Sequence, residues 1–347
     1  MNKFVIIQLL MGMIPFLSEL SAEKADTSGI FDVYSYETPQ MGVPFRIILY
    51  TDQGKSHADR AASLAWKRIA SLNHILSNYE TESELSRLGY ESGEGIWTKV
   101  SDDMWTVLAS AQRLSVLSEG AFDMTLGPAT ALWRKVRREK RMPSSSALDS
   151  MWERTGWDRL LMRPEDQSVC LTVSGMRLDP GGIAKGFALD EAVEVLKEQG
   201  IPHALISGGG DMVFYGGKPT GDPWQIRLAG FTESREEGPM IELKDGAVAT
   251  SGDLFQYVEI DGVRHSHILN PRTGLGLTVR TLTTVIAFTG IQADSLATTL
   301  SVLGPQRAPA WTEKHVNDCG VRMLWLDEDV VTREWVHDDQ NSWFGSR

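Results

Sequence analysis

Apolar residues recur at helical spacing in three long stretches of the chain. Residues 57–78, 102–118 and 291–303 each carry apolar positions three or four apart, and this spacing places them on one face of a helix. The second stretch stops at Glu119 and Gly120, and glycine is common just past a helix end. A further helix is predicted after the glycines at 181 and 182, with a buried face formed by Ala188, Leu189, Ala192, Val193 and Leu196.

Strand-like stretches occupy the N-terminal part and most of the C-terminal half. Residues 31–50 predict a strand, a turn at Met41 and Gly42, and a second strand,. From Leu160 onward strands dominate, beginning with a hairpin around residues 164–167. Helices and strands are mixed unevenly, which favours a single α+β domain with mixed sheets and packed helices over a regular βαβ arrangement.

The first residues are typical of a secretory signal peptide. Lys3 precedes an apolar stretch at 4–16, and small residues at 18–22 fit cleavage after Ala22,. We therefore expect an exported, periplasmic protein, with an uncleaved segment at the inner membrane as the alternative. No cysteine lies near the cleavage site, so a lipid anchor is not expected. The predicted division is a signal peptide at 1–22, a linker at 23–30, a domain at 31–335 and a tail at 336–347.

The composition is that of a globular protein, with 42% hydrophobic and 23% charged residues among 347. The net charge of -12 argues against general nucleic-acid binding, which depends on basic surface. One stretch, RKVRREKR at 134–141, is strongly basic. It fits a solvated helix end or loop, or a docking patch for an acidic partner, and a polar connector is predicted at 142–149. Cys170 and Cys319 could pair after export or remain buried thiols.

The segment with the most distinctive chemistry is LDPGGIAKGFALD, which begins at Leu178, together with the downstream ISGGGD that ends at Asp211. Glycines expose backbone N–H groups, and a helix that starts behind them favours a phosphate. Lys185 could neutralise that phosphate as a point charge. Neither the P-loop spacing nor the dinucleotide-binding GxGxxG pattern is present, so this turn alone does not identify the ligand.

Other candidate residues lie far away in the sequence. Asp294 and Thr298 are four apart on a predicted helix, where a carboxylate and a hydroxyl could hold a hard cation. His267 precedes the turn NPRTG and could act as a general base. Tyr79 could stack on a flat ring or simply pack. The stretch ATSGD, residues 249–253, is predicted to form a turn that could bind a ligand.

Seven motifs taken together are more specific than any one of them. In chain order they are SNYETESELSRL, GAFDMTLGP, LDPGGIAKGFALD, ISGGGD, AVATSGD, SHILNPRTG and ADSLATTL. Over residues 31–305 they closely resemble the ApbE family of FAD:protein FMN transferases. The resemblance implies a T-fold-related α+β domain that uses Mg²⁺ and FAD. It implies transfer of FMN to a threonine hydroxyl of an exported or membrane-bound redox flavoprotein, with release of AMP.

The resemblance also assigns roles to individual residues. It implies a metal site formed by Asp294, Thr298 and a backbone carbonyl of the glycine turn, at Gly182. It implies His267 as the base and Lys185 as the residue that balances phosphate charge. The residues expected to contact FAD are Met41, Tyr79, Ala121, Phe122, Asp123, Asp179, Lys185 and Ile268.

Three positions depart from the family pattern. Asn270 replaces an aspartate before Pro-Arg-Thr-Gly, Ser207 replaces an asparagine, and Val43 replaces a threonine. Asn270 removes a charge but can keep a turn-forming acceptor. Two other functions remain open at this point: an FAD diphosphatase that releases FMN and AMP to water, and a non-enzymatic exported flavin-binding protein.

Overall fold

The computed structural model describes residues 30–93, 95–231, 238–254, 256–327, 329–338 and 343–344. The predicted signal peptide at 1–22 and the linker up to residue 29 lie outside these ranges. In the part of the chain that is described, no helix is both long enough and apolar enough to span a membrane.

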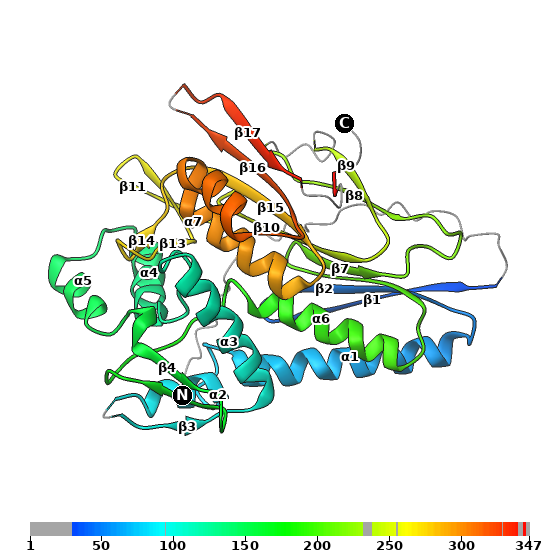
Figure 1. The fold of residues 1–347 in the computed structure, drawn as a ribbon, viewed down its shortest axis with the longest axis horizontal. Helices are drawn as coiled ribbons and strands as arrows, with labels where there is room; N and C mark the ends of the chain where they lie inside the picture. The colour runs from blue at the N-terminus through cyan, green and yellow to red at the C-terminus, as the bar shows by residue number, and fades with distance from the viewer. Residues whose placement is uncertain are drawn as a thin grey trace, which may run out of the picture.

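The structure is built on an eight-stranded antiparallel sheet with the order β1-β2-β6-β7-β10-β15-β16-β17. Figure 1 shows this sheet running across the molecule from β1 to β17. Its strands are β1 (Asp32–Gln40), β2 (Val43–Thr51), β6 (His203–Gly208), β7 (Asp211–Tyr215), β10 (Gly246–Gly252), β15 (Thr281–Ala287), β16 (Gly320–Leu326) and β17 (Thr332–His337).

One face of the sheet is covered by α1 (Lys55–Leu76), α6 (Ala184–Glu198) and α7 (Gly290–His315). Successive side chains along each strand point to opposite faces of the sheet. In β2, Ile47 and Leu49 join the core under these helices, whereas Ile48 between them faces the other side. The helix α3 (Asp102–Leu117) packs against α1 and α7 and extends the same core.

The opposite face of the sheet carries a second, smaller core. A hairpin of β8 (Trp224–Arg227) and β9 (Met240–Leu243) covers it and contributes the fully buried Trp224. Trp343, within the predicted tail, is only 7% exposed and packs into this core, with its ring at 5.0 Å from Phe288. The packed structure therefore includes a residue of the segment that we expected to form a tail.

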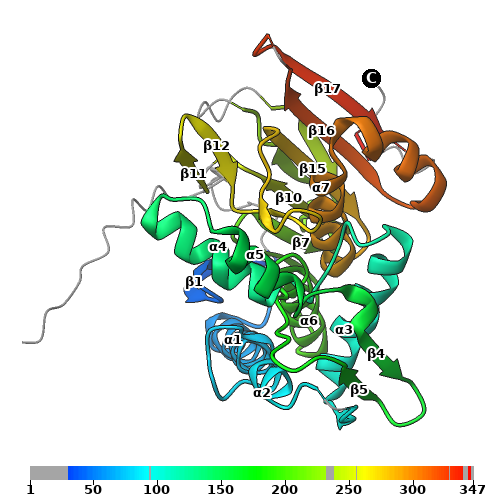
Figure 2. The same cartoon turned by 90° about the vertical axis from the view of Figure 1, so that its left-hand side faces the viewer.

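Smaller elements gather at one end of the sheet. Figure 2 shows α4 and α5 on this side of the molecule, with α2, β4 and β5 below them. A third apolar cluster joins α4 and α5 to β11, β13 and β14. The elements are α2 (Glu84–Tyr90), β3 (Thr98–Lys99), α4 (Gly127–Glu139), α5 (Ser145–Trp152), a short helix at Trp157–Arg159, β4 (Leu160–Arg163), β5 (Ser168–Leu171), β11 (Tyr257–Ile260), β12 (Val263–Ser266), β13 (Leu269–Asn270) and β14 (Leu275–Gly276).

The α+β class, the N-terminal hairpin with its turn at Met41 and Gly42, and the long helices are confirmed. Two local predictions are wrong: the polar connector at 142–149 is helical from Ser145, and the ATSGD turn is mostly the interior of β10. The helix predicted at 291–303 is confirmed as the first part of α7, which has non-helical backbone at Gly304 and then continues to His315. Two states are open to the cysteines from the sequence, and the structure shows the second: Cys170 and Cys319 are buried thiols that do not pair with each other.

The N-terminal ends of α6 and α7 are in direct contact. A Cβ atom at Gly186 would lie 2.1 Å from the carbonyl oxygen of Gly290, and one at Gly290 would lie 2.5 Å from the carbonyl oxygen of Gly186. Only glycine permits this approach. Asp190 then caps α7, because its carboxylate accepts the N–H groups of Gly290 at 2.6 Å and Ile291 at 2.9 Å.

We predict that Gly186→Ala lowers the free energy of unfolding by about 3 kcal/mol, since the methyl group must displace backbone rather than a flexible side chain. Chemical denaturation measures the change. Gly181→Ala is the matched control, because its methyl group would meet only the Asp179 carboxylate, at 3.1 Å. Equal stability of the two variants would contradict the proposed contact.

Candidate active site

A buried cluster of charges lies where α6 and α7 meet. Lys185, in the first turn of α6, places its Nζ 2.5 Å from Asp211 Oδ2 and 3.4 Å from both carboxylate oxygens of Asp294. Asp294 also accepts the Gly186 N–H at 3.0 Å, and Asp211 accepts the Thr250 N–H at 3.3 Å. Two carboxylates therefore share one ammonium group.

The electrostatics of this cluster follow from its burial. Burial, together with the nearby charge of Asp294, raises the pKa of Asp211 to about 6 although Lys185 lowers it. Burial alone would lower the pKa of Lys185, but the two carboxylates outweigh it and the pKa is raised. Lys185 therefore stays charged, and its charge is already used to hold Asp211 and Asp294 together.

Thr298 lies one turn after Asp294 and faces the glycine turn. A Cβ atom at Gly182 would come within 2.8 Å of the Thr298 hydroxyl oxygen. The neighbouring hydroxyls of Ser295 and Thr299 bond back to helix carbonyls, whereas that of Thr298 has no hydrogen-bond partner among the described residues.

Mg²⁺ prefers oxygen donors such as a carboxylate, a hydroxyl and a backbone carbonyl. Asp294, Thr298 and the carbonyl of Gly182 could therefore hold this ion. The described residues contain no group of three His, Cys, Asp or Glu side chains that could bind a metal. A metal in this part of the chain would therefore depend on hydroxyl, carbonyl and substrate oxygens.

Asp179 connects the glycine turn to the end of α1. One of its carboxylate oxygens accepts the Gly181 N–H at 3.0 Å and the Asn78 side-chain amide at 2.9 Å. Asn78 in turn accepts a hydrogen bond from Arg134 at 3.2 Å. The Arg134 guanidinium lies 4.1 Å from the centre of the Tyr79 ring, which is 78% exposed. Arg134 thus fixes Tyr79 beside the turn.

The segment with Ala121, Phe122 and Asp123 runs alongside the same turn. The Asp179 N–H donates to the Met124 carbonyl at 2.7 Å, which ties the two motifs together. Ala121 and Phe122 are buried. Asp123 accepts both the N–H and the hydroxyl of Thr125, and burial raises its pKa to about 6.

His267 and Ile268 join β12 to β13. The His267 ring Nδ1 lies 3.2 Å from the carbonyl oxygen of Gln256, so we assign the proton to Nδ1 and leave Nε2 as a free acceptor. The residue is exposed, yet the protein around the ring desolvates it and lowers its pKa to about 4, with further lowering by Arg137 and Lys185. His267 is therefore a neutral base at pH 7, and Ile268 beside it is buried.

These groups surround one region of the molecule. Asp179 and Gly182 belong to one turn, and the charge of Lys185 reaches His267. The turn with Met41 leads directly into Val43. A Cβ atom at Gly209 would lie 3.1 Å from the Val43 side chain and 3.5 Å from the Lys185 side chain, so both side chains lie next to Gly209. The predicted residues at 41, 79, 121–123 and 179 are thus connected to the Lys185–Asp294 cluster through contacts of neighbouring residues, and the link to His267 is the effect of the Lys185 charge on its ring.

Sequence reasoning missed three residues of the site. Asp211 ends the ISGGGD motif, and a carboxylate directly after three glycines is the signal from which its role could be inferred. Arg134 lay within the basic stretch, and only the fold shows that it covers Tyr79. Asp190 looks like an ordinary helix-surface acid in the sequence, and its capping of α7 could not be inferred. Asn270 keeps a turn-forming acceptor, since its side chain accepts the Arg272 N–H at 2.9 Å.

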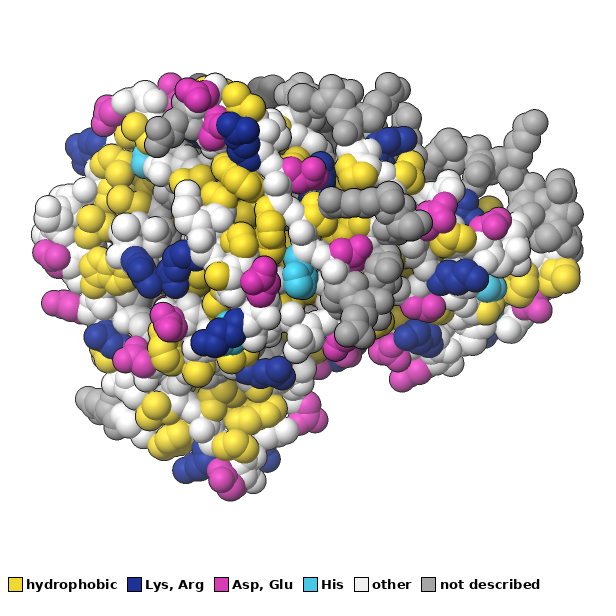
Figure 3. All heavy atoms as spheres, turned by 45° about the horizontal axis from the view of Figure 1, so that its top comes forward, with side chains coloured by type: hydrophobic (Ala, Val, Ile, Leu, Met, Phe, Trp, Pro, Cys, Tyr) yellow, Lys and Arg dark blue, Asp and Glu magenta, His cyan; other side chains and the backbone are white. Residues whose placement is uncertain are grey.

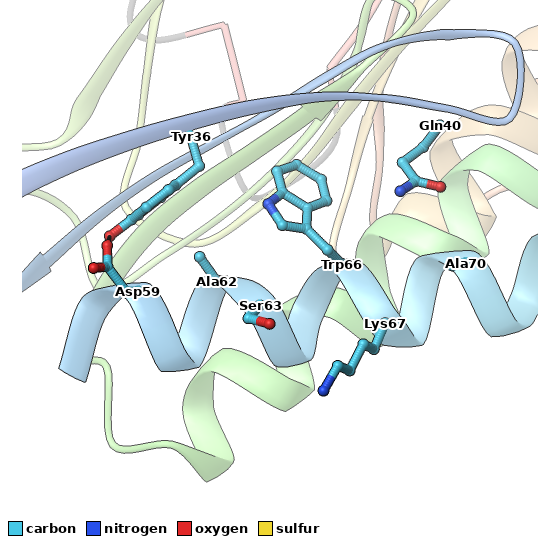
Figure 4. A pocket seen from close by; sticks show the side chains of 8 residues that line it. All are labelled: Tyr36, Gln40, Asp59, Ala62, Ser63, Trp66, Lys67 and Ala70. Carbon is cyan, nitrogen blue, oxygen red and sulfur yellow. Dashed lines mark hydrogen bonds between the residues drawn. The ribbon is translucent and has the colours of Figure 1, made fainter. Parts of the chain in front are cut away.

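Of two cavities in the described part of the structure, one is lined in part by a predicted site residue and the other by none. One, of about 390 Å³, lies between β1 and α1 and is lined by none of the predicted site residues. Figure 4 shows Trp66 pointing into it from α1, with the Tyr36 hydroxyl bonded to Asp59. The other, of about 200 Å³, is lined by Asp123 and by Pro271 and Arg272 of the NPRTG turn, so it brings two of the predicted motifs together.

The surface does not concentrate charge of one sign on the face shown in Figure 3, where basic, acidic and hydrophobic side chains are interspersed.

Fold and site together define an α+β protein with a buried carboxylate–lysine cluster at the meeting point of two helices. The family described as the ApbE family matches residues 41–323. The chain belongs to the ApbE family.

Individual relatives match along most of the chain. The FAD:protein FMN transferase of Vibrio cholerae is 32% identical over 295 residues, which cover 84% of this chain and 87% of that protein. Its counterpart in Haemophilus influenzae is 31% identical over 316 residues, with 87% and 89% covered.

Solved structures show the same fold. The flavin transferase ApbE from Vibrio cholerae has a TM-score of 0.81 at 29% identity, covering 90% of this chain and 99% of that one. The apo form of the Pseudomonas stutzeri flavinyl transferase ApbE also has a TM-score of 0.81, at 28% identity, covering 91% and 98%.

We predict that the His267 ring titrates near pH 4 instead of near its usual 6.5, because desolvation disfavours the imidazolium,. Proton NMR of the ring hydrogens measures the midpoint, and His267→Gln assigns the signal. A lowered folded-state pKa means that the contribution of this residue to stability is present above about pH 6.5 and is lost as the pH falls through 4. A midpoint near 6.5 would contradict the desolvated ring.

Proposed function

We propose that this protein transfers FMN from FAD to a threonine hydroxyl of a target flavoprotein, with Mg²⁺ at the site and AMP as the second product. The site observation that carries the proposal is the unpartnered Thr298 hydroxyl, which lies against Gly182 one turn from the buried Asp294. The relatives named FAD:protein FMN transferase, which match most of the chain, support the reaction class.

The metal would be held by Asp294, Thr298 and the carbonyl of Gly182. When bound there, Mg²⁺ supplies charge neutralisation for the diphosphate and for its transition state. Lys185 keeps Asp294 in place together with the Gly186 N–H. Asp211 shares the ammonium group of Lys185, so the position of this side chain is fixed before the substrate arrives.

The flavin half of FAD would lie along Met41, Tyr79 and the segment at 121–123. Arg134 holds the Tyr79 ring from one side, which restricts its rotation. Asp179 accepts hydrogen bonds from Asn78 and Gly181, so it is oriented to accept a further one from a hydroxyl or ring N–H of FAD. Ile268 supplies an apolar contact next to the base.

In the reaction, the threonine oxygen forms a bond to the phosphorus on the FMN side of the diphosphate. The bond from that phosphorus to the bridging oxygen breaks, and AMP leaves with this oxygen. The proton of the threonine hydroxyl passes to Nε2 of His267, which is free because Nδ1 faces the carbonyl oxygen of Gln256. A neutral imidazole is required for this step, and the lowered pKa of His267 provides it at neutral pH.

We also propose that the protein acts outside the cytoplasm, in the periplasm, on an exported or membrane-bound redox flavoprotein. The support is the sequence pattern of the first 22 residues, with Lys3 ahead of an apolar stretch and small residues before position 23. An uncleaved segment would keep the protein at the inner membrane and close to such a target.

The first test is incubation of the protein with FAD and Mg²⁺, with and without an exported flavoprotein acceptor. We expect a mass gain of one FMN on an acceptor threonine, and we expect His267→Gln to slow it roughly 10²- to 10⁴-fold while FAD binding, measured by flavin fluorescence, is retained. Rapid release of free FMN without acceptor would instead indicate an FAD diphosphatase. Tight FAD binding without any AMP release would indicate a flavin-binding protein.

The second test concerns the metal directly. We predict that Thr298→Val weakens the binding of Mn²⁺, used as a spectroscopic stand-in for Mg²⁺, about tenfold, or ~1.4 kcal/mol. Electron paramagnetic resonance measures free Mn²⁺ without any need for catalysis. Thr299→Val is the matched control, because that hydroxyl is buried and bonded to the Ser295 carbonyl. The same affinity in both variants would remove Thr298 from the metal site.

A further inference from the structure

The second half of α4 and the residues just after it form a basic surface. We call it the α4 basic surface, and it consists of Lys135, Arg137, Arg138, Lys140 and Arg141. Arg137 is half-buried and the other four residues are exposed. Glu139, also exposed, is the one acidic side chain in this stretch, so five positive charges and one negative charge lie close together in a chain with a net charge of -12.

These five side chains have no ion pair or hydrogen bond among the described residues. Several other arginines of the described residues are paired. Arg68 binds the carboxylates of Asp103 and Glu191, and Arg322 binds Glu334. The chain has 46 acidic residues against 34 Lys and Arg, so intramolecular partners are plentiful. The charges of the α4 basic surface are nevertheless left open to another molecule.

The surface is attached to the segment that holds the base. Trp133 of α4 donates its indole N–H to the Ser266 carbonyl at 3.1 Å, next to His267, and its ring lies 5.6 Å from that of His265. Arg137 follows Trp133 by one helical turn, so it lies on the same side of α4. Its charge is felt at the His267 ring.

A second row of α4 begins at another part of the site. Arg134 stacks on Tyr79 and bonds to Asn78, and Arg138 follows it by one turn. One row, Trp133 and Arg137, starts next to the base. The other row, Arg134 and Arg138, starts at the predicted flavin contact, and both rows lead away from the site along α4. A polypeptide that brings a hydroxyl to His267 has this surface as a neighbour.

We propose that the α4 basic surface docks an acidic segment of the acceptor protein, on either side of the threonine that receives FMN. The inference rests on the proposed function, since it names what the second substrate touches. An acidic polypeptide fits because it supplies the carboxylates that these five side chains lack. In the proposed function the diphosphate of FAD is met by Mg²⁺ and the glycine turn, so the nucleotide leaves these charges unused.

Electrostatic docking of this kind is sensitive to salt and increases the rate of encounter. Binding should weaken as ionic strength rises, and reversal of charge on α4 should affect the acceptor much more than FAD. These two properties separate a docking surface from a nucleotide site and from a merely solvated helix end.

The binding test uses a labelled peptide with one threonine flanked by aspartates, and a counterpart with lysines in place of the aspartates. We expect the acidic peptide to bind the full-length protein, and Arg137→Glu combined with Arg138→Glu to raise its Kd about tenfold or more by fluorescence anisotropy. Arg307→Glu, an exposed position on α7 with the same change of charge, should leave the Kd unchanged. Absent binding, or equal binding of the lysine peptide, would overturn the proposal.

A second pair of substitutions guards against local disruption, because Arg137 is half-buried. Lys135→Glu combined with Arg138→Glu changes two exposed positions and should weaken acidic-peptide binding in the same direction. Thermal unfolding of each variant reports whether the fold is intact. Unchanged peptide affinity in a folded double variant would refute the docking role.

The kinetic test links the surface to catalysis. In FMN transfer to a flavoprotein acceptor, the double variant at 137 and 138 should raise KM for the acceptor about tenfold and leave the Kd for FAD unchanged. A rise in the Kd for FAD alone would assign the charges to the nucleotide and overturn the proposal. Failure of the unmodified protein to transfer FMN would refute the proposed function, and the peptide measurement would still decide the docking surface.

Discussion

The contact between the first turns of α6 and α7 is the constraint on which the rest of the site depends. Gly186 and Gly290 let the two backbones touch, so the positive ends of two helix dipoles lie together. Buried carboxylates offset this positive potential: Asp190 caps α7, and Asp294 accepts the Gly186 N–H. Because Lys185 and Thr298 lie on these same two helices, their distance is set by the glycine contact.

The charge balance of this contact explains why a cation and a polyphosphate would bind there together. Asp211 and Asp294 bring two carboxylates against the single ammonium group of Lys185, so the cluster has an excess of negative charge when both are ionised. A diphosphate would be repelled by that excess. Asp294, Thr298 and the carbonyl of Gly182 would hold a divalent cation here, and its charge would offset this excess, for which the protein alone lacks the positive charge. Burial is the main cause of the raised pKa of Asp211, and the nearby charge of Asp294 adds to it.

The sequence predicted the parts of this fold that depend on local periodicity. The hairpin β1–β2 and the helices α1 and α3 follow from apolar spacing, and the site residues follow from motifs that contain most of their own chemistry. ATSGD was misread because small residues also suit the interior of β10, where neighbouring strands supply the packing. Asp190 and Arg134 could not be assigned because their partners, Gly290 and Tyr79, lie 100 and 55 positions away, and only tertiary structure brings them together.

The proposed docking surface also bears on the strength of the base. Desolvation is the main reason for the lowered pKa of His267, but Arg137 and Lys185 lower it further. A base with a pKa near 4 stays neutral yet accepts a proton weakly. An acidic segment bound to α4 would bring carboxylates close to Arg137 and offset its effect on the ring. Those carboxylates would act against the part of the lowered pKa that Arg137 causes, whereas desolvation, its main cause, would remain.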